Sequence, residues 1–185
     1  MFLDLTLKVT PKMVADAQGN ETKALVGHVG THFDVMDKEF PLEYVERPGL
    51  LFDVRAVEGR DIEPEDVELK LVEPGMFVAF CSGYSERVEY GSREYFTSHP
   101  QLSDRLVEEL TARNISMIAV DFGGIRRGKE HTPKDQFCAD RGVFVVENLY
   151  GLTALLEHGR RFVAHTYPMN YSGVTGLPCR VVAEV

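Results

Sequence analysis

The sequence predicts an α/β protein with a mixed sheet and covering helices. Two observations support this prediction. In the middle of the chain, short unbroken apolar runs alternate with helical patterns, and this order is typical of a partly parallel sheet. Strand patterns flank that region at both ends, which indicates a mixed sheet. The length of 185 residues with 44% hydrophobic content suits one domain, residues 1–185.

The first part of the chain contains weak signals. Residues 1–9 alternate apolar and polar side chains and predict a strand. Residues 10–23 are polar, with Gly19-Asn20, and predict a loop or hairpin. Residues 50–54 are rich in strand-forming residues. Residues 61–67 resemble the start of a helix, because acidic side chains suit its first turn.

Three apolar runs in the centre predict buried strands: residues 76–81, 116–120 and 143–146. Apolar side chains at helical spacing predict a helix over 103–114, capped by Ser103 or Asp104. Further helices are predicted over 135–141 and 152–158, final strands over 161–167 and 179–183, and loops over 82–98, 122–134 and 172–178.

The segment 27–34 is the richest in chemistry. It places His28, His32 and Asp34 within seven residues. Imidazole and carboxylate together suit Zn²⁺, Mn²⁺ or Fe²⁺, and no sulfur biases the site toward a structural zinc. Glycines on both sides predict a loop with close backbone approach rather than a regular helix. From the spacing alone, two surface histidines near a helix N-cap are an equal alternative.

Two carboxylates follow directly on predicted buried strands. Asp121 follows the strand 116–120, and Glu147 follows the strand 143–146. The carboxyl ends of strands are where sites gather in open α/β sheets, so both residues are site candidates. Capping of the next helix explains them equally well.

Composition excludes several classes of protein. A formal net charge of -9 argues against a nucleic-acid partner, since no basic stripe is present to neutralise phosphates. Three widely spaced cysteines predict reduced thiols in a cytoplasmic protein, although a disulfide between two of them stays open. The first residues do not resemble a signal peptide, and no apolar stretch is long enough to span a bilayer, so no membrane partner is expected.

These segments resemble the cyclase family, which includes bacterial kynurenine formamidases and isatin hydrolase. The family signature is similar to H-x-G-T-H-x-D-x-P-x-H, and His28–Asp34 reads H-V-G-T-H-F-D. The resemblance continues in the same order over nearly the whole chain, in the segments 4–6, 95–103, 119–121, 146–149 and 173–183.

The resemblance implies a swivelling β/β/α fold and a homodimer or homotetramer. It implies one or two divalent ions per chain, Zn or Mn, that serve hydrolysis of an amide, lactam or similar bond in a small substrate; N-formylkynurenine, from tryptophan catabolism, is the best-known example. His28, His32 and Asp34 correspond to the first ligand triad, and Glu147 to a ligand from the second half of the chain.

Two departures from the family pattern stand out. The last His of the signature is Lys38 here, and its Pro is Met36. A ligand His twelve residues before the family's Glu is Asp135, which can also bind a divalent ion; His131, four residues earlier, is an alternative if the loop shifts. In addition, the family's T-P-S after the strand-end Asp is Phe122-Gly123-Gly124.

These departures leave three hypotheses. Lys38 is the candidate catalytic acid or base, if neighbouring cations and desolvation lower its pKa. Alternatively, a lysine ammonium lies among Asp34, Asp135 and Glu147 and replaces the second cation. In the third hypothesis the protein binds a metal or small molecule without turnover, because the family's shuttle His is absent. Phe33 and Met36 are expected to line the substrate side.

Overall fold

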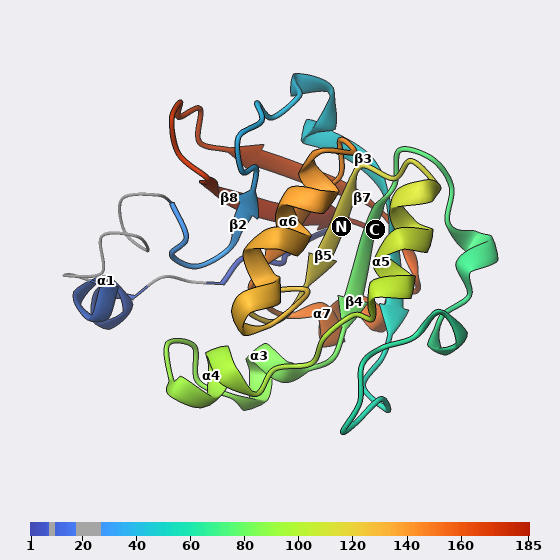
Figure 1. Ribbon diagram of the computed structural model, residues 1–185. Helices are drawn as coiled ribbons and strands as arrows, with labels where there is room; N and C mark the ends of the chain where they lie inside the picture. Colours follow the sequence, from blue (N-terminus) through green and yellow to red (C-terminus); the bar gives the residue numbers. More distant parts are fainter. Residues whose placement is uncertain (8–9, 18–26) are drawn as a thin grey trace.

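The computed structural model describes residues 1–7, 10–17 and 27–185 (Figure 1). Its strands are β1 (Phe2–Asp4), β2 (His32–Asp34), β3 (Glu46–Asp53), β4 (Phe77–Cys81), β5 (Met117–Val120), β6 (Phe144–Glu147), β7 (Arg161–Pro168) and β8 (Gly176–Glu184). Its α-helices are α1 (Pro11–Ala17), α3 (Tyr84–Arg87), α4 (Arg93–Thr97), α5 (Asp104–Ala112), α6 (His131–Ala139) and α7 (Leu152–Leu156).

The strands form one mixed sheet in the order β1-β8-β2-β6-β5-β4-β3-β7. The four strands β3, β4, β5 and β6 pair in parallel, and every other pairing is antiparallel. A further pairing between β7 and β8 closes the sheet into a barrel. The prediction of a mixed sheet with helices is therefore confirmed.

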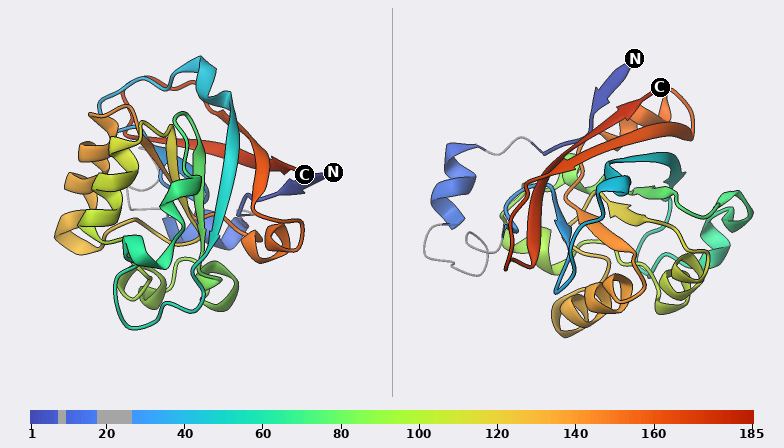
Figure 2. Two further views of the ribbon diagram at one scale, coloured as in Figure 1. Left: turned by 90° about the vertical axis from the view of Figure 1, so that its right-hand side faces the viewer. Right: turned by 90° about the horizontal axis from the view of Figure 1, so that it is seen from above.

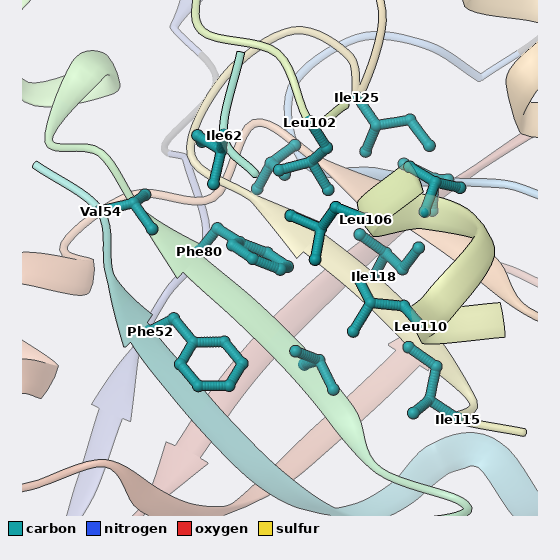
Figure 3. Close-up of a cluster of buried hydrophobic side chains, with 14 of the residues drawn as sticks. Phe52, Val54, Ile62, Phe80, Leu102, Leu106, Leu110, Ile115, Ile118 and Ile125 are labelled. Carbon is teal, nitrogen blue, oxygen red and sulfur yellow. The ribbon is translucent and has the colours of Figure 1, made fainter. Parts of the chain in front are cut away.

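The apolar runs in the centre are buried on both faces of the sheet. Alternate residues of β4 point to opposite sides, so Val78 and Phe80 belong to one hydrophobic cluster while Phe77 and Ala79 belong to the other. The first cluster includes Leu106 and Leu110 of α5 (Figure 3), and the second fills the other face. This two-sided burial explains why the strands read as unbroken apolar runs rather than alternating ones.

Helices α5 and α6 cover the same face of the parallel strands, and α3 and α4 lie beyond the carboxyl end of β4 (Figures 1 and 2). Helix α5 begins as predicted, because the Ser103 hydroxyl accepts a hydrogen bond of 3.1 Å from the Leu106 amide. The two chain ends lie side by side (Figure 2), where the Met1 ammonium donates to the Val185 carbonyl oxygen.

Several predictions of loops were wrong. Residues 11–17 form α1, whereas the rest of the predicted loop, residues 18–23, lies outside the described residues, as do residues 8–9 of the first strand. The predicted loop 82–98 contains α3 and α4, and the expected helix at 61–67 is only a 3-10 turn, Pro64–Asp66. Pro133 indicated a loop, yet it lies in the first turn of α6, where its missing N–H costs no helical hydrogen bond.

The three cysteines are free thiols, as predicted. Among the described residues, no helix combines the length and the apolar character that a membrane span requires.

His99 is a buried histidine outside any candidate metal site. Its side chain is 1% exposed and its ring stacks on Phe122 at a centroid distance of 5.5 Å. Its Nδ1 lies 2.7 Å from the Pro100 carbonyl oxygen. Burial, together with the positive charges of Arg127 and His131, lowers the pKa of His99 to about 4. This environment indicates a packing role for His99 rather than a ligand role.

This lowered pKa predicts a pH-dependent stability. The imidazole stays neutral in the folded protein but is protonated in the unfolded chain below about pH 6.5, so the free energy of unfolding falls as the pH falls toward 4. We expect this residue to account for about 3 kcal/mol of that loss. Chemical denaturation of wild type and His99→Asn at pH 7.5 and pH 4 measures it, because the Asn amide can still donate to Pro100. Equal losses in both proteins would contradict the assignment.

Candidate metal centre

The histidine motif lies partly in a strand rather than wholly in a loop. Residues His32–Asp34 form β2, which is inserted between β6 and β8. Gly27, which precedes His28, does provide the predicted close approach of two backbone segments, because a side chain at this position would collide with the carbonyl oxygen of Gly176. Strand geometry then sends the side chains of His32 and Asp34 to one face of the sheet.

Phe33 points to the opposite face, and its prediction as a substrate-lining residue is wrong. Its ring is fully buried in the second hydrophobic cluster and packs on Phe40 at a centroid distance of 4.7 Å. The reason is that successive side chains of a strand point to opposite faces of the sheet, so Phe33 faces away from His32 and Asp34.

Two neighbouring elements bring the remaining ligand candidates to β2. Glu147 is the last residue of β6 and is the register partner of His32. Asp135 lies in α6, and His131 is the first residue of the same helix, one turn earlier. The five predicted metal residues therefore come together where β6 ends: His28, His32, Asp34, Asp135 and Glu147.

The first group consists of His28, His32 and Asp34, whose ligand atoms lie within 4.8 Å of one another. The two imidazoles stack at 4.8 Å between centroids. Nε2 of His28 lies 3.7 Å, and Nε2 of His32 3.6 Å, from Oδ1 of Asp34. His32 Nδ1 lies 2.8 Å from the Gly30 carbonyl oxygen. Because a carbonyl only accepts, Nδ1 carries a proton, and Nε2 faces the carboxylates, where a metal ion would replace its proton.

The second group consists of Asp34, His131, Asp135 and Glu147, so Asp34 belongs to both groups. His131 Nε2 lies 3.2 Å from Oδ2 of Asp135 and 2.9 Å from Oε1 of Glu147. Both contacts are at ion-pair distance; burial disfavours the protonated ring, yet the carboxylates of Glu147 and Asp135 raise the pKa of His131 to about 10. The sequence offered His131 only as an alternative; its spacing of four residues before Asp135, one helical turn, was the available signal.

This donor set fits a divalent cation. Among the described residues, four buried ligand atoms have no hydrogen-bond partner: His32 Nε2, Asp34 Oδ2, Asp135 Oδ1 and Glu147 Oε1. Buried polar atoms are normally paired, so a convergent set of unpaired ones calls for an explanation. Imidazole nitrogen and carboxylate oxygen are the donors that Zn²⁺, Mn²⁺ and Fe²⁺ accept.

The pKa shifts of the ligand candidates also indicate a site for a cation. Burial raises the pKa of Asp135 and of Glu147, and the Asp34 charge raises both further. Burial opposes ionisation of Asp34 as well, but the nearby histidines outweigh it and lower that pKa. Burial disfavours protonated His32, yet the carboxylates of Asp34 and Glu147 raise its pKa to about 9. Acidic groups thus crowd a buried site that requires positive charge.

Asn148, the residue after β6, is hydrogen-bonded to the segment that precedes β2. Its Nδ2 donates to the Gly30 carbonyl oxygen at 3.0 Å, the same oxygen that His32 Nδ1 contacts. Its Oδ1 accepts from the Tyr95 hydroxyl at 2.9 Å, and its carbonyl oxygen accepts from the Thr31 hydroxyl at 2.7 Å. The residue has a φ of 59°, a left-handed conformation that Asn tolerates. It therefore fixes the backbone on both sides of the donor set.

A cavity of about 780 Å³ lies between the segment 35–45 and the residues 167–177, and none of the ligand candidates lines it. Thr175 lines it, and the Thr175 hydroxyl oxygen lies 3.1 Å from His28 Nε2. Met36 also lines it, in a left-handed conformation with a φ of 58°. Met36 therefore stays a candidate for contact with a substrate in this cavity, whereas Phe33 does not line it.

Lys38 does not join the donor set in the described structure. Its ammonium lies 3.0 Å from Asp37 and 2.8 Å from Asp140, and it is half-exposed. Hydrogen bonds to these two carboxylates raise its pKa, whereas the catalytic hypothesis required a lowered one. That expected lowering is wrong, because Lys38 meets anions rather than cations. The hypothesis of a lysine ammonium among Asp34, Asp135 and Glu147 is also wrong for Lys38, since the side chain in contact with Asp135 and Glu147 is that of His131.

The role of Asn148 is testable with Asn148→Gly, which removes the amide without straining the left-handed backbone. We expect the affinity for Zn²⁺ to fall by about 10- to 100-fold, because the His32 ring loses its support through Gly30. Competition with a chromophoric chelator measures the affinity. Tyr95→Phe is the matched control, since it removes only the bond at the other end of the amide. Unchanged Zn²⁺ affinity in a folded Asn148→Gly protein would refute this role.

Solved structures share this fold over 99% of the chain. Isatin hydrolase A from Ralstonia solanacearum has a TM-score of 0.76 at 18% identity, over 91% of its own chain. Isatin hydrolase A from Labrenzia aggregata has a TM-score of 0.74 at 18% identity, over 93% of its chain. A protein from Bacillus stearothermophilus described as a predicted metal-dependent hydrolase has a TM-score of 0.73 at 21% identity, over 97% of its chain. At these identities the likeness shows the fold alone.

A search among curated proteins gave no match. The sequence model of the family described as "Putative cyclase" matches residues 3–125, which include His28, His32 and Asp34 but end before α6. This match covers well over half of the chain, and the shared fold extends through the rest. The chain belongs to the Cyclase family.

Proposed function

We propose that this protein is a metal-dependent hydrolase that cleaves a C–N bond in a small amide or lactam. The observation that carries the proposal is the convergence of buried donor atoms without hydrogen-bond partners, from His32, Asp34, Asp135 and Glu147, in a Cyclase-family chain. A divalent ion held by such donors polarises a carbonyl group and lowers the pKa of water toward neutrality. The donor set supports metal-assisted hydrolysis, and the family supports a C–N bond as the bond that is cleaved.

The chain's own residues provide orientation for this chemistry. The Gly30 carbonyl fixes the His32 ring, and Asn148 fixes that carbonyl. Asp34 contributes to both ligand groups, so its carboxylate sets the spacing between them. Carboxylates and imidazoles held in place before substrate arrives need no reorganisation during the reaction.

A cavity near the site has room for a small substrate. Its volume of about 780 Å³ lies within the range of ligand sites, and Thr175, which lines it, contacts His28. Two structural relatives carry the name isatin hydrolase, and isatin is a cyclic amide. N-formylkynurenine, expected from the family resemblance, is an open-chain amide of similar size. Both are therefore the substrates to test first.

The second candidate function is binding of a metal or small molecule without turnover. The pairing of Lys38 with Asp37 and Asp140 favours it, because this lysine replaces the family's shuttle His and its pKa is raised. Hydrolysis assays on the metal-loaded protein separate the two functions.

The hydrolase proposal predicts that His32→Ala loses both bound metal and activity. Wild type loaded with Zn²⁺ or Mn²⁺ should hydrolyse at least one of isatin, N-formylkynurenine and simple lactams, and the variant should fall to background, because Nε2 of His32 is a buried donor. Metal content by mass spectrometry and product formation by absorbance measure this. His165→Ala is the control, since it removes an imidazole that pairs with Glu184 elsewhere. Bound metal without turnover of any amide would favour the binding function.

Lys38→Ala tests proton transfer. We expect turnover to fall by less than about tenfold, short of the roughly 10²- to 10⁴-fold that loss of a general acid or base costs, because the ammonium is held by Asp37 and Asp140. Steady-state kinetics and metal content are measured together. A loss of about 10²-fold or more at unchanged metal content would restore Lys38 as the proton donor.

A further inference from the structure

The start of α6 supplies a nitrogen donor that position 135, an aspartate here, does not. His131 Nε2 faces Oδ2 of Asp135 at 3.2 Å and Oε1 of Glu147 at 2.9 Å. Oε1 of Glu147 and Oδ1 of Asp135 are both buried without a hydrogen-bond partner. Imidazole nitrogen and carboxylate oxygen atoms gathered this closely are arranged as the ligands of a metal ion would be, with the ion in place of the imidazole proton.

The imidazole of His131 fits into a niche that Gly124 leaves open. A Cβ atom on Gly124 would lie 2.8 Å from Cε1 and 3.0 Å from Nδ1 of His131, closer than side chains normally approach. It would also lie 2.9 Å from the Arg126 carbonyl oxygen. Gly124 has a φ of +133°, which side-chain-bearing residues rarely adopt. The ring therefore occupies space that any other residue at this position would fill.

The walls of this niche are held rigidly. Arg126 is 9% exposed, and its Nη1 donates to the Leu102 carbonyl oxygen at 3.0 Å and to Oδ2 of Asp61 at 2.6 Å. Its Nε donates to Oε2 of Glu130 at 3.0 Å. Glu130 directly precedes His131 at the start of α6. The loop after Gly124 and the first turn of α6 are thus joined, so the niche cannot widen at little cost.

We propose that Gly124 is a positioning residue whose missing side chain admits the His131 imidazole, so that His131, and not position 135, supplies the nitrogen ligand of a second ion position formed with Asp34, Asp135 and Glu147. This inference rests on the proposed metal-dependent function and deepens it. It also gives one physical reason for two departures in the sequence: the glycine pair after Phe122 and the aspartate at position 135, where the family has a ligand His.

Titration of the full-length apoprotein with Co²⁺, followed by visible absorption, tests this inference without using activity. Wild type should bind two Co²⁺ ions. Gly124→Ala and His131→Ala should each weaken the second ion by about tenfold or more, with the first ion retained. Gly128→Ala is the matched control in the same loop, because Gly128 also has a positive φ and a Cβ there meets open space. His32→Ala should weaken the first ion instead.

A double-mutant cycle separates displacement of the ring from backbone strain. If Gly124→Ala acts by displacing the imidazole, it should cause no further loss in the His131→Ala background. Additive losses would overturn the positioning role of Gly124. Should Gly124→Ala alone unfold, the double variant must recover part of the thermal stability, since the clash with the ring is gone while the close approach to the Arg126 carbonyl oxygen remains; thermal unfolding measures this, and no recovery at all would also overturn it.

The remaining outcomes distinguish this inference from the proposed function. Two ions bound with unchanged affinity in His131→Ala would overturn the inference and leave the hydrolase proposal standing. A single ion that is lost in His32→Ala but insensitive to His131→Ala would do the same. No Co²⁺ binding by wild type would overturn both proposals.

Discussion

Three carboxylates, those of Asp34, Asp135 and Glu147, meet in one buried place, and the arrangement around them depends on how their charge is balanced. Each comes from a different element: β2, α6 and β6. Anions in a low-dielectric site repel strongly unless cations or hydrogen-bond donors compensate. The structure surrounds them with imidazoles, and a divalent ion is the compensation that the donor chemistry suits. This requirement explains why histidines from β2 and from α6 converge on the same point.

The rigidity of the site comes from backbone contacts rather than from the ligands themselves. Asn148 connects the end of β6 to the loop before β2, and the Thr31 hydroxyl that bonds to it also accepts from the Leu7 amide. Arg126 performs a similar task for α6 through Asp61 and Glu130. Ligands held in this way keep their separation whether or not substrate is present, which is the physical meaning of preorganisation.

The pattern of the sequence was sufficient for much of the fold. The buried strands β4, β5 and β6 and the helix α5 appear within a few residues of their predicted positions, because two-sided burial and helical spacing leave strong periodic signals. Short helices were missed where their signals were local and weak, as at Ser92, whose hydroxyl caps α4 by accepting from the Tyr95 amide. Proline at the start of α6 was ambiguous, because the same residue suits a loop and a first helical turn.

The sequence by itself determined the mixed sheet and the identity of the ligand candidates, since imidazole and carboxylate chemistry is a property of residue type. It determined much less about where the side chains point and which of them come into contact. Only the tertiary structure decided that Phe33 faces the core, because strand pleating is fixed by which face β2 buries. Only the tertiary structure placed His131 beside Glu147 and Lys38 beside Asp140. These contacts join residues far apart in the chain, and their geometry depends on how α6 packs against the sheet rather than on any local pattern.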